Sequence, residues 1–401
     1  MSEPEEIVRI AAKGDGVTAS GRHVAGAAPG DRVAADGAIE HGPHHVDPPC
    51  RHFPTCGGCQ LQHVDEAALA RFVFERVAFA AESQGLEPER IAPADLSPPR
   101  SRRRASLHAV NGGGRALVGF RESGSHRVVD MHECHVLEPR LFALVGPLRT
   151  MLSARKGRFA VDIELALTDQ GVDCTLGGYE LDGLDATEDL LDFCRDNALA
   201  RLTLDQGYGP EAFWEPEPVT ITLGGVPVSC PPGAFLQATQ HGEDALVSAA
   251  REWLAGAGRV ADLFAGLGTF AFALDAETQV MAAEAARDAH LACRAVAGRT
   301  GREVQAVHRD LFRNPLDAQE LAAFDGVLLD PPRAGARTQI EQIAASGVER
   351  VVYISCNPSS WARDCAMLKA AGYRLAELRP VGQFRWSTHV ELASLSIKSG
   401  E

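Results

Sequence analysis

One cysteine stands where a nucleophile could act. Cys356 lies in the segment Ser355-Cys356-Asn357-Pro358, directly after an apolar run that begins at Val351. A cysteine in a protein core is ordinarily structural, but a cysteine that ends a strand beside a ligand cleft is placed to attack an electrophile. The Asn-Pro pair that follows is not typical of a core position. We therefore predict that Cys356 is a nucleophile.

A carboxylate follows a second apolar run. Asp330-Pro331-Pro332-Arg333 comes directly after residues 326–329. Two prolines fix the backbone behind Asp330, so its side chain is expected to project into a cleft. Methyltransferases that act on exocyclic amines of bases carry an aromatic residue after a related Pro-Pro pair. Arg333 takes that place here, which argues against this class.

A turn with two glycines suggests a third part of the same site. The segment is Asp262-Leu263-Phe264-Ala265-Gly266-Leu267-Gly268-Thr269-Phe270. Glycines at such a position let the backbone approach a nucleotide-like ligand. The pattern G-x-G-x-x-G is missing, which argues against a dinucleotide. Glu284 ends the next apolar run and is placed to hold ribose hydroxyls, although a surface glutamate would look the same.

These segments need a scaffold that brings strand ends together. From Thr239 onward, short apolar runs alternate with helical patterns, which predicts a doubly wound, mostly parallel sheet. We expect a helix at Glu243–Leu254 and another opening after the glycine turn. The strands are expected at Val260–Phe264, Val280–Glu284, Val304–His308, Gly326–Leu329, Val351–Ser355 and Glu391–Ile397. The fold class is thus α/β with a Rossmann-like domain.

The first 235 residues have a different pattern of apolar residues and glycines. Residues 7–39 contain short apolar runs broken by glycines, which predicts a small β-barrel or part of one, before a linker-like stretch at 37–49. Asp65–Glu82 has helical spacing, residues 100–235 read as mainly β, and a helix is expected near Thr187–Ala198. We expect three domains, 1–45, 46–235 and 236–401, with the helix at 65–82 packing on the last.

Four cysteines are spaced as a metal site. Cys50, Cys56 and Cys59 lie close together, and Cys134 stands 75 positions after Cys59. On spacing alone, a zinc ion and an iron–sulfur cluster are equally acceptable. Ten cysteines in a chain expected in the cytoplasm do not indicate a disulfide framework.

Charge and hydropathy bear on the partners. The net charge is −15, from 39 Lys and Arg against 54 Asp and Glu, yet residues 100–134 carry seven arginines and three acids. The segment Arg100–Arg104 is therefore a candidate RNA contact on an acidic protein, with a solvated loop as the alternative. No run of 18 apolar residues occurs, and the acidic start of the chain lacks a secretory signal. A cytoplasmic monomer without membrane contact is expected.

Taken together, these motifs resemble the RNA uracil-5-methyltransferase family. The segments 262–270, 330–335, 355–358, Thr388-His389-Val390-Glu391 and Phe235-Leu236-Gln237 occur in the family's order. The four spaced cysteines resemble the cluster ligands of its large-subunit ribosomal RNA members, and residues 7–39 resemble a shortened TRAM module, a small OB-like barrel. The likeness covers nearly the whole chain.

The resemblance implies a function and the residues that carry it. The methyl donor would be S-adenosylmethionine, and the cofactor contacts would be Gln237, Phe264, Thr269, Glu284, Asp310 and Asp330. The catalytic pair would be Cys356 and Glu391, and a structural [4Fe–4S] cluster would bind Cys50, Cys56, Cys59 and Cys134 within a mainly-β iron–sulfur domain. Departures from the family pattern fall at Thr239, Thr269, Gly382 and Arg385.

The chemistry accounts for these residues, and three alternatives stay open. C5 of uracil is a poor nucleophile until a thiolate adds at C6, and a base must later remove the C5 proton. A 5-methylcytidine enzyme would need a cysteine beside Asp330-Pro331, and an adenine N6-methyltransferase would not need Cys356. An iron–sulfur RNA-binding protein without this activity would leave the α/β part unused. Ribosomal RNA is favoured as substrate, with tRNA as the alternative.

Overall fold

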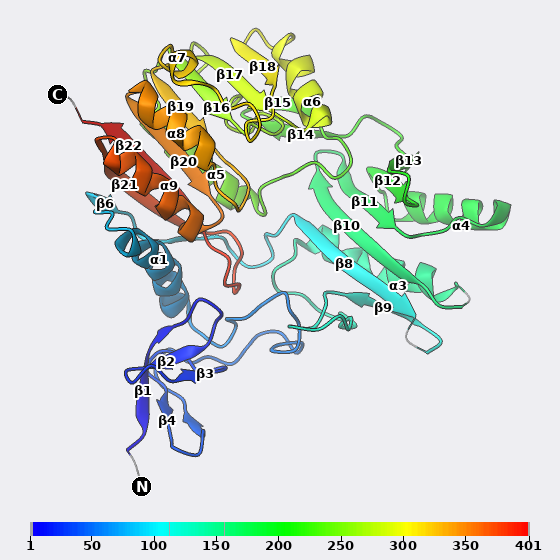
Figure 1. Ribbon diagram of the computed structural model, residues 1–401. Coiled ribbons are helices and arrows are strands. Elements are labelled where there is room, and N and C mark those ends of the chain that lie inside the picture. Colours follow the sequence, from blue (N-terminus) through cyan, green and yellow to red (C-terminus); the bar gives the residue numbers. More distant parts are fainter. Residues whose placement is uncertain (1–2, 112, 156, 400–401) are drawn as a thin grey trace.

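The computed structural model describes residues 3–111, 113–155 and 157–399 and places them in three larger sheets and one hairpin (Figure 1). Figure 1 shows the nine-stranded sheet and its helices at the top, a second sheet with its helices on the right, and a small sheet near the N-terminus below.

The nine-stranded sheet carries the strand ends at which chemistry was predicted. Its order is β18-β17-β16-β19-β20-β22-β21-β6, and β7 also pairs with β21. Its first five strands are parallel, and β22 runs antiparallel between β20 and β21. The strands are β16 (Arg259–Leu263), β17 (Gln279–Glu284), β18 (Val304–His308), β19 (Gly326–Leu329), β20 (Arg350–Ser355), β21 (Tyr373–Gly382) and β22 (Glu391–Lys398).

Apolar cores lie on both faces of this sheet, because alternate residues of each strand point to opposite sides. Val351 and Tyr353 of β20 join one core, whereas Val352 and Ile354 join the other. This explains why these strands read as continuous apolar runs in the sequence. The covering helices are α5 (Gln240–Trp253), α6 (Arg287–Ala297), α7 (Ala318–Leu321), α8 (Arg337–Ser346) and α9 (Pro358–Ala370).

One prediction for this region was wrong, and one strand was missed. No helix follows the glycine turn: residues 269–274 form only successive turns, with single helical hydrogen bonds such as Leu274 N–H to the carbonyl of Phe270. Asp262 accepts the backbone N–H of Ala271 at 3.0 Å, and this bond holds the segment between β16 and β17 in turns rather than in a helix. Strand β21 was not predicted, because charged residues interrupt its apolar pattern.

Segments from before residue 236 complete this part of the molecule. The two short strands β6 (Arg90–Ile91) and β7 (Asp95–Leu96) pair in parallel with β21 at the sheet edge. Helix α1 (Glu66–Ser83) starts at Asp65, whose side chain accepts the N–H of Ala68, and buries Leu69, Phe72, Val73 and Val77 in the core shared with α8 and α9. The hairpin of β14 (Thr220–Leu223) and β15 (Val226–Ser229) packs in the core on the other face.

A six-stranded sheet forms the central part, with the order β13-β12-β11-β10-β8-β9. The strands are β8 (Arg104–Asn111), β9 (Ala116–Gly119), β10 (Ala160–Thr168), β11 (Gly171–Gly177), β12 (Arg201–Asp205) and β13 (Pro210–Trp214). Helices α2 (Pro139–Ala143), α3 (Val145–Ser153) and α4 (Gly183–Asp196) share an apolar core with it. Helix α4 confirms the predicted helix near 187–198, shifted by a few residues.

The N-terminal sheet has five short antiparallel strands in the order β3-β2-β1-β4-β5. They are β1 (Glu5–Ile10), β2 (Gly16–Thr18), β3 (His23–Val24), β4 (Arg32–Val33) and β5 (Ile39–Glu40), so the last falls inside the expected linker. Their shared core is small and centres on Ile7, Ala27 and Val33. The edge strands β3 and β5 are not paired with each other in the described sheet.

Across the described ranges, no helix has both the length and the apolar character needed to cross a bilayer.

Candidate active site

Two cavities meet at the end of β20. One, of about 710 Å³, lies over the carboxyl ends of the parallel strands and is lined by the glycine turn. The other, of about 630 Å³, lies between these strand ends and the central sheet and is lined by arginines. Four residues line both cavities: Phe235, Arg333, Cys356 and Glu391. A group held in one cavity could therefore react with a group held in the other at Cys356.

Cys356 is held by the loop that it shares with α9. The side-chain oxygen of Asn357 accepts the N–H of Ser359 at 3.1 Å and so caps the helix, while its amide donates to the carbonyl of Arg333 at 2.8 Å. Ser360 donates a second hydrogen bond to that carbonyl at 3.0 Å. These contacts fix the loop of Arg333 relative to Cys356.

A buried carboxylate on α9 reinforces this connection. Asp364 is fully buried and accepts hydrogen bonds from the N–H of Ala336 and the hydroxyl of Tyr353, each at 2.8 Å. Its partner Arg363 also donates to the loop, at the carbonyl of residue 334. Gly335 lies against Asp364 so closely that a Cβ there would stand 2.5 Å from its Oδ2. The loop after β19 is thus fastened to the helix that follows Cys356.

The electrostatics around Cys356 disfavour a free thiolate. Burial, together with the negative charges of Glu391 and Asp330, raises the pKa of the Cys356 thiol to about 11, and Arg333 acts in the opposite direction. A cation or a proton donor entering the cavities would lower that pKa. The arrangement keeps the thiol protonated until a substrate or cofactor changes its surroundings.

Glu391 lies at the start of β22 and is only 5% exposed. Burial and the nearby charge of Asp330 raise the pKa of Glu391 to about 8, which lies in the range of a general base. Burial also raises the pKa of Asp330 to about 7, although a hydrogen bond from Gln237 opposes this. Two carboxyl groups with such values beside one thiol indicate proton transfer at this point.

A chain of amide side chains connects the two carboxylates to the rest of the site. Gln237 donates to Asp330 Oδ2 at 3.1 Å and accepts from Gln383 at 3.0 Å, and Gln383 in turn accepts the N–H of Ala238 at 3.0 Å. Gln383 was not singled out from the sequence. It directly follows β21, whose apolar pattern is interrupted, so no local signal marked it.

The larger cavity brings together most of the residues predicted to contact the cofactor. Gln237, Phe264, Thr269, Glu284 and Asp330 all line it. Phe264 has a backbone φ of 63° and packs its ring against Phe312 at 5.4 Å between centroids. Such a conformation in a non-glycine residue is strained and is common where backbone contacts a ligand. Glu284 accepts the N–H of Gly266 at 2.8 Å and so shapes the turn.

Asp310 is not among the described residues that line this cavity. Its Oδ1 accepts the N–H groups of Phe312 and Arg313 at 3.0 and 3.3 Å, so it orders the turn that carries Phe312. Asp262 is fully buried below the glycine turn, and no partner of its Oδ1 is found in the described structure. Burial raises the pKa of Asp262 well above its usual range.

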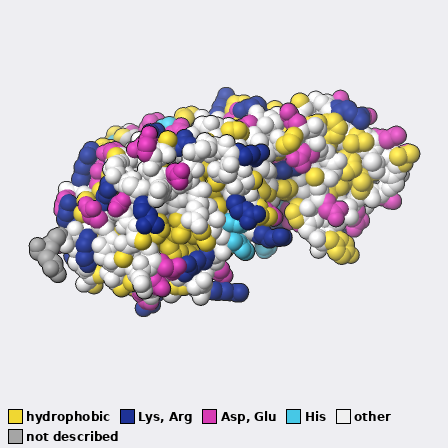
Figure 2. All heavy atoms as spheres, turned by 90° about the horizontal axis from the view of Figure 1, so that it is seen from above, with side chains coloured by type: hydrophobic (Ala, Val, Ile, Leu, Met, Phe, Trp, Pro, Cys, Tyr) yellow, Lys and Arg dark blue, Asp and Glu magenta, His cyan; other side chains and the backbone are white. Residues whose placement is uncertain are grey.

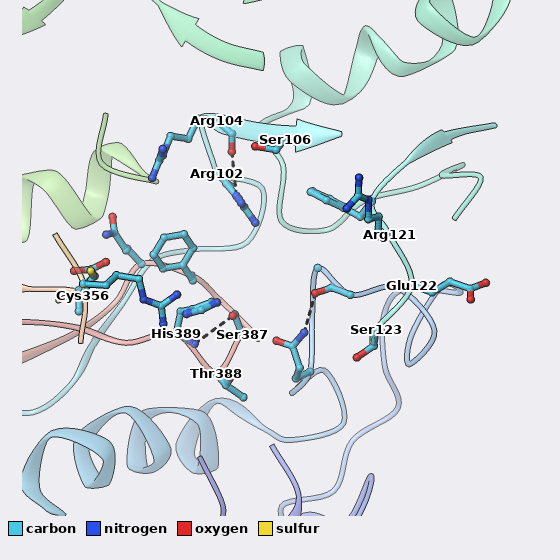
Figure 3. A pocket seen from close by; sticks show the side chains of 18 of the residues that line it. Arg102, Arg104, Ser106, Arg121, Glu122, Ser123, Cys356, Ser387, Thr388 and His389 are labelled. Carbon is cyan, nitrogen blue, oxygen red and sulfur yellow. Dashed lines mark hydrogen bonds between the residues drawn. The ribbon is translucent and has the colours of Figure 1, made fainter. Parts of the chain in front are cut away.

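The smaller cavity gathers four arginines, namely Arg102, Arg104, Arg121 and Arg333 (Figure 3). Arg102 lies between the rings of Phe120 and Phe384, at 5.7 and 5.6 Å from their centroids. Arg104 lies 4.5 Å over the ring of Phe235, an aromatic side chain that is 60% exposed. Figure 2 shows arginine and histidine side chains gathered where the larger part of the molecule meets the smaller lobe.

The predicted basic segment Arg100–Arg104 is divided between two roles. Arg102 and Arg104 line the cavity, but Arg103 is buried and turned away from it. Arg103 donates to the carbonyl of Gln237 at 3.0 Å and pairs with Glu243 at 2.5 Å. Arg103 directly precedes β8, and its side chain points to the opposite side from those of Arg102 and Arg104. Arg103 therefore stabilises the site rather than facing a ligand.

Three departures from the family pattern have structural explanations in this chain. Thr239 caps α5 by accepting the N–H of Gly242 at 2.9 Å. Gly382 lets β7 approach, because a Cβ there would stand 2.5 Å from Leu96 Cδ2. Arg385 donates to the carbonyl of residue 97 and pairs with Glu66 at 2.9 Å. Each fits the α1–β7 segment against the catalytic sheet.

The four spaced cysteines line one small cavity next to the arginine cavity. Cys50, Cys56, Cys59 and Cys134 all have free thiols, and burial raises the pKa of each. In the described part of the chain, no group of three or more His, Cys, Asp or Glu side chains is arranged to hold a metal ion. The metal-ligand set therefore stays a prediction.

Comparison with known proteins extends these observations. Residues 233–399 match the tRNA (Uracil-5-)-methyltransferase family. An uncharacterized RNA methyltransferase of Zymomonas mobilis is 46% identical over 98% of this chain and 100% of the relative. A 23S rRNA (uracil(1939)-C(5))-methyltransferase of Pectobacterium atrosepticum is 33% identical over 88% of this chain and 80% of the relative. The crystal structure of Pyrococcus abyssi tRNA (uracil-54, C5)-methyltransferase with S-adenosyl-L-homocysteine shares the fold, with a TM-score of 0.75 at 22% identity over 98% of this chain and 100% of that chain.

Together with the family match, the Rossmann-like sheet and its cavity at the carboxyl ends of parallel strands identify an S-adenosylmethionine-dependent methyltransferase. The relatives make the class more specific. The chain belongs to the RNA uracil-5-methyltransferase family, and its activity is S-adenosylmethionine-dependent methylation of RNA at C5 of uracil.

Proposed function

We propose that the protein methylates C5 of a specific uridine through a covalent adduct between Cys356 and C6 of the base. The observation that carries this proposal is the position of Cys356 and Glu391 at the junction of a cofactor-sized cavity and an arginine-lined cavity. The first cavity suits S-adenosylmethionine, because Glu284 and Asp330 offer acceptors to hydroxyl and amino groups while Phe264 and Phe312 offer an apolar wall. When bound, this cofactor supplies an electrophilic methyl group.

Cys356 begins the reaction. The thiolate adds to C6 of the uracil ring, and the electron pair of the C5–C6 bond moves to C5 and O4 as an enolate. Arg333, which lines both cavities and lowers the pKa of Cys356, favours formation of the thiolate. The enolate carbon C5 then takes the methyl group.

Glu391 completes the reaction. The methylated adduct still carries its C5 proton, so a base must remove that proton before the C6–S bond breaks and the thiolate leaves. Glu391 faces both cavities, and its raised pKa makes it a stronger base than an exposed glutamate. Asp330, held by Gln237, lines the first cavity and is a second carboxylate near the thiol.

The RNA is more consistent with large-subunit ribosomal RNA than with tRNA. The relative of Pectobacterium atrosepticum, which carries the rRNA name, is matched at 33% identity, whereas the tRNA-specific enzyme of Pyrococcus abyssi is similar at 22%. The same reaction on a tRNA uridine is the alternative. Because the target base must enter a cavity, it has to be unpaired or flipped out of a helix, at a cost of roughly a few kcal/mol.

We also propose that Cys50, Cys56, Cys59 and Cys134 hold a [4Fe–4S] cluster. The donor set supports this, because four thiols from two parts of the chain, residues 50–59 and residue 134, line one small cavity. The role would be structural: Gly57 and Gly58, between two of these cysteines, line the arginine cavity. The N-terminal sheet, residues 1–45 in our division, is proposed as a TRAM-like RNA-binding module beside the central part, 46–235, and the catalytic part, 236–401.

The covalent step can be tested with RNA that contains 5-fluorouridine in place of uridine. Fluorine at C5 cannot leave as a proton does, so the adduct should persist as a protein–RNA band in denaturing electrophoresis. Cys356→Ala should abolish this band, and Cys365→Ala, which alters a buried cysteine on the following helix α9, should keep it. A stable adduct in the Cys356→Ala protein would overturn the assignment.

A further inference from the structure

The arginine cavity is larger than a single base requires. Cys356 and Glu391 lie at one end of it, and the loop Arg121–Gly124 lies at the other (Figure 3). In Figure 3 the labelled side chains of Arg121, Glu122 and Ser123 stand across the cavity from Cys356, with Arg102 and Arg104 between them. The outer part therefore has residues of its own that the transfer reaction does not use.

The loop at the outer end is held firmly. The carbonyl of Arg121 accepts the N–H of Gly57 at 2.9 Å, and the N–H of Ser123 donates to the carbonyl of Thr55 at 3.0 Å. Gly57 approaches so closely that a Cβ there would stand 2.8 Å from the carbonyl oxygen of Arg121. Glu122 donates its N–H to the carbonyl of Arg127 at 2.8 Å, which closes the hairpin. The position of Arg121 is thus set before any ligand binds.

The charges in this cavity are not neutralised. The lining has four arginines against two carboxylates, in a chain whose net charge is −15. Among the residues that the structure describes, none of the four arginines forms an ion pair: Arg102 donates to a carbonyl and lies over two aromatic rings, Arg104 lies over one aromatic ring, and Arg333 has no side-chain partner. The carboxylate of Glu122 lies 3.7 Å from Nε of Arg127, a residue that is not among those lining the cavity.

Arg121 is the arginine at the outer end of the cavity (Figure 3). Its one side-chain contact is to Nδ1 of His108 at 3.4 Å, but that nitrogen also lies 2.7 Å from Asp162 Oδ1. A single ring nitrogen cannot donate to the carboxylate and accept from the arginine at once. The donors of Arg121 are therefore available to an acceptor from outside, and a phosphate matches their forked geometry.

We propose that the outer part of this cavity, formed by Arg121, Ser123 and His108, is a phosphate subsite for a nucleotide next to the target uridine. This inference rests on the proposed function, because it takes the base at Cys356 to be part of a single RNA strand. The strand would pass from Cys356 beneath Arg102 and Arg104 to Arg121. The subsite reads no base directly; it sets the register in which the target base enters the inner cavity.

The test measures binding without turnover. A fluorescein-labelled single-stranded oligouridine is titrated with wild-type protein and with Arg121→Gln at several salt concentrations, and the binding constant is read from fluorescence anisotropy. Loss of one phosphate contact should weaken binding several-fold at low salt and reduce the slope of log K against log salt by about 0.7. Arg121→Lys should restore most of the slope, because the charge remains.

Controls separate this subsite from general charge and from the chemistry. Arg140→Gln, which changes an exposed arginine on α2, removes the same charge away from the cavity and should leave the slope unchanged. Arg121→Gln should keep wild-type S-adenosylmethionine affinity, because Arg121 does not line the cofactor cavity among the described residues. Equal slopes in Arg121→Gln and wild-type protein would overturn the subsite. If Arg121→Gln reduces the salt slope as expected but wild-type protein forms no adduct with 5-fluorouridine RNA, the covalent mechanism is refuted and the subsite is not.

Discussion

Replacing Glu391 by Gln should change the two halves of the reaction in opposite directions. The substitution keeps the shape of a side chain that is 5% exposed but removes its charge. That charge both raises the pKa of the Cys356 thiol and, in the proposed mechanism, accepts the C5 proton. The variant should therefore have a more reactive thiol and yet be unable to complete the reaction.

The size of the first effect follows from the site. The Cys356 pKa of about 11 lies two units above the ordinary value of 9.0, with burial the largest cause and Glu391 the next. Removing the second cause should lower that pKa by at most about one unit, or ~1.4 kcal/mol, which raises the thiolate fraction up to about tenfold. Because the pKa of Glu391 is about 8, the glutamate is largely neutral at pH values well below 8. The variant should then match wild type near neutral pH and exceed it only at higher pH.

The assay is alkylation by iodoacetamide, with modification of the Cys356 peptide followed by mass spectrometry across this pH range. The second effect is read with RNA and methyl-labelled cofactor: proton removal fails, elimination stalls, and a labelled protein–RNA band survives denaturing electrophoresis. Glu341→Gln, which changes an exposed carboxylate on α8, should behave as wild type in both assays. Normal turnover without a trapped adduct would show that a residue other than Glu391 is the general base. Equal alkylation rates at high pH would show that Glu391 does not act on the thiol.

Other substitutions address the remaining parts of the site. Glu284→Ala should weaken S-adenosylmethionine binding by about 1–2 kcal/mol in calorimetry, since it removes an acceptor and frees the glycine turn, and unchanged affinity would refute its role. Cys134→Ser should lose most of the roughly four irons per chain that anaerobic purification is expected to give, whereas Cys174→Ser should keep them; one zinc in colourless protein would contradict the cluster. Gly335 has a φ of 81°, and a Cβ at this position would stand 2.5 Å from Asp364 Oδ2. Gly335→Ala should therefore lower the free energy of unfolding, measured in urea, by about 1–3 kcal/mol. An unchanged unfolding curve would show that this loop can shift freely.

Much of the catalytic sheet could be predicted from sequence because its strands are buried on both faces. Runs such as residues 351–354 read as continuous apolar stretches, and the residue after each run lies at the carboxyl edge of the sheet. Cys356 and Asp330 line a common cavity for this reason, and Glu284, which ends β17 of the same sheet, lines it too. The glycine turn was located correctly, but its helix was not, because Asp262 binds backbone that a helix would use.

The residues that sequence reasoning missed depend on contacts between distant segments. Charged residues interrupt the apolar pattern of strand β21, so Gln383 beyond it carried no signal. Arg121 looked like one of seven arginines in a basic stretch, and its position in the cavity comes from the cysteine loop that holds it. Arg103 belongs to the same stretch but is buried against Glu243, which charge counting could not reveal.

The parallel pairing of β6 and β7 with β21 has a consequence for how the chain folds during synthesis. Residues 90–96 leave the ribosome long before residues 373–382, yet they form neighbouring strands, and α1 buries its apolar side in a core that includes helices and strands made late. Contacts between residues so far apart in the sequence form slowly, and apolar surface stays exposed until they have formed. Leu69, Phe72, Val73 and Val77 would have to be shielded until translation ends. Nascent chains halted before residue 373 should therefore bind chaperones through α1, and expression of residues 236–401 alone should give a sheet with an unprotected edge.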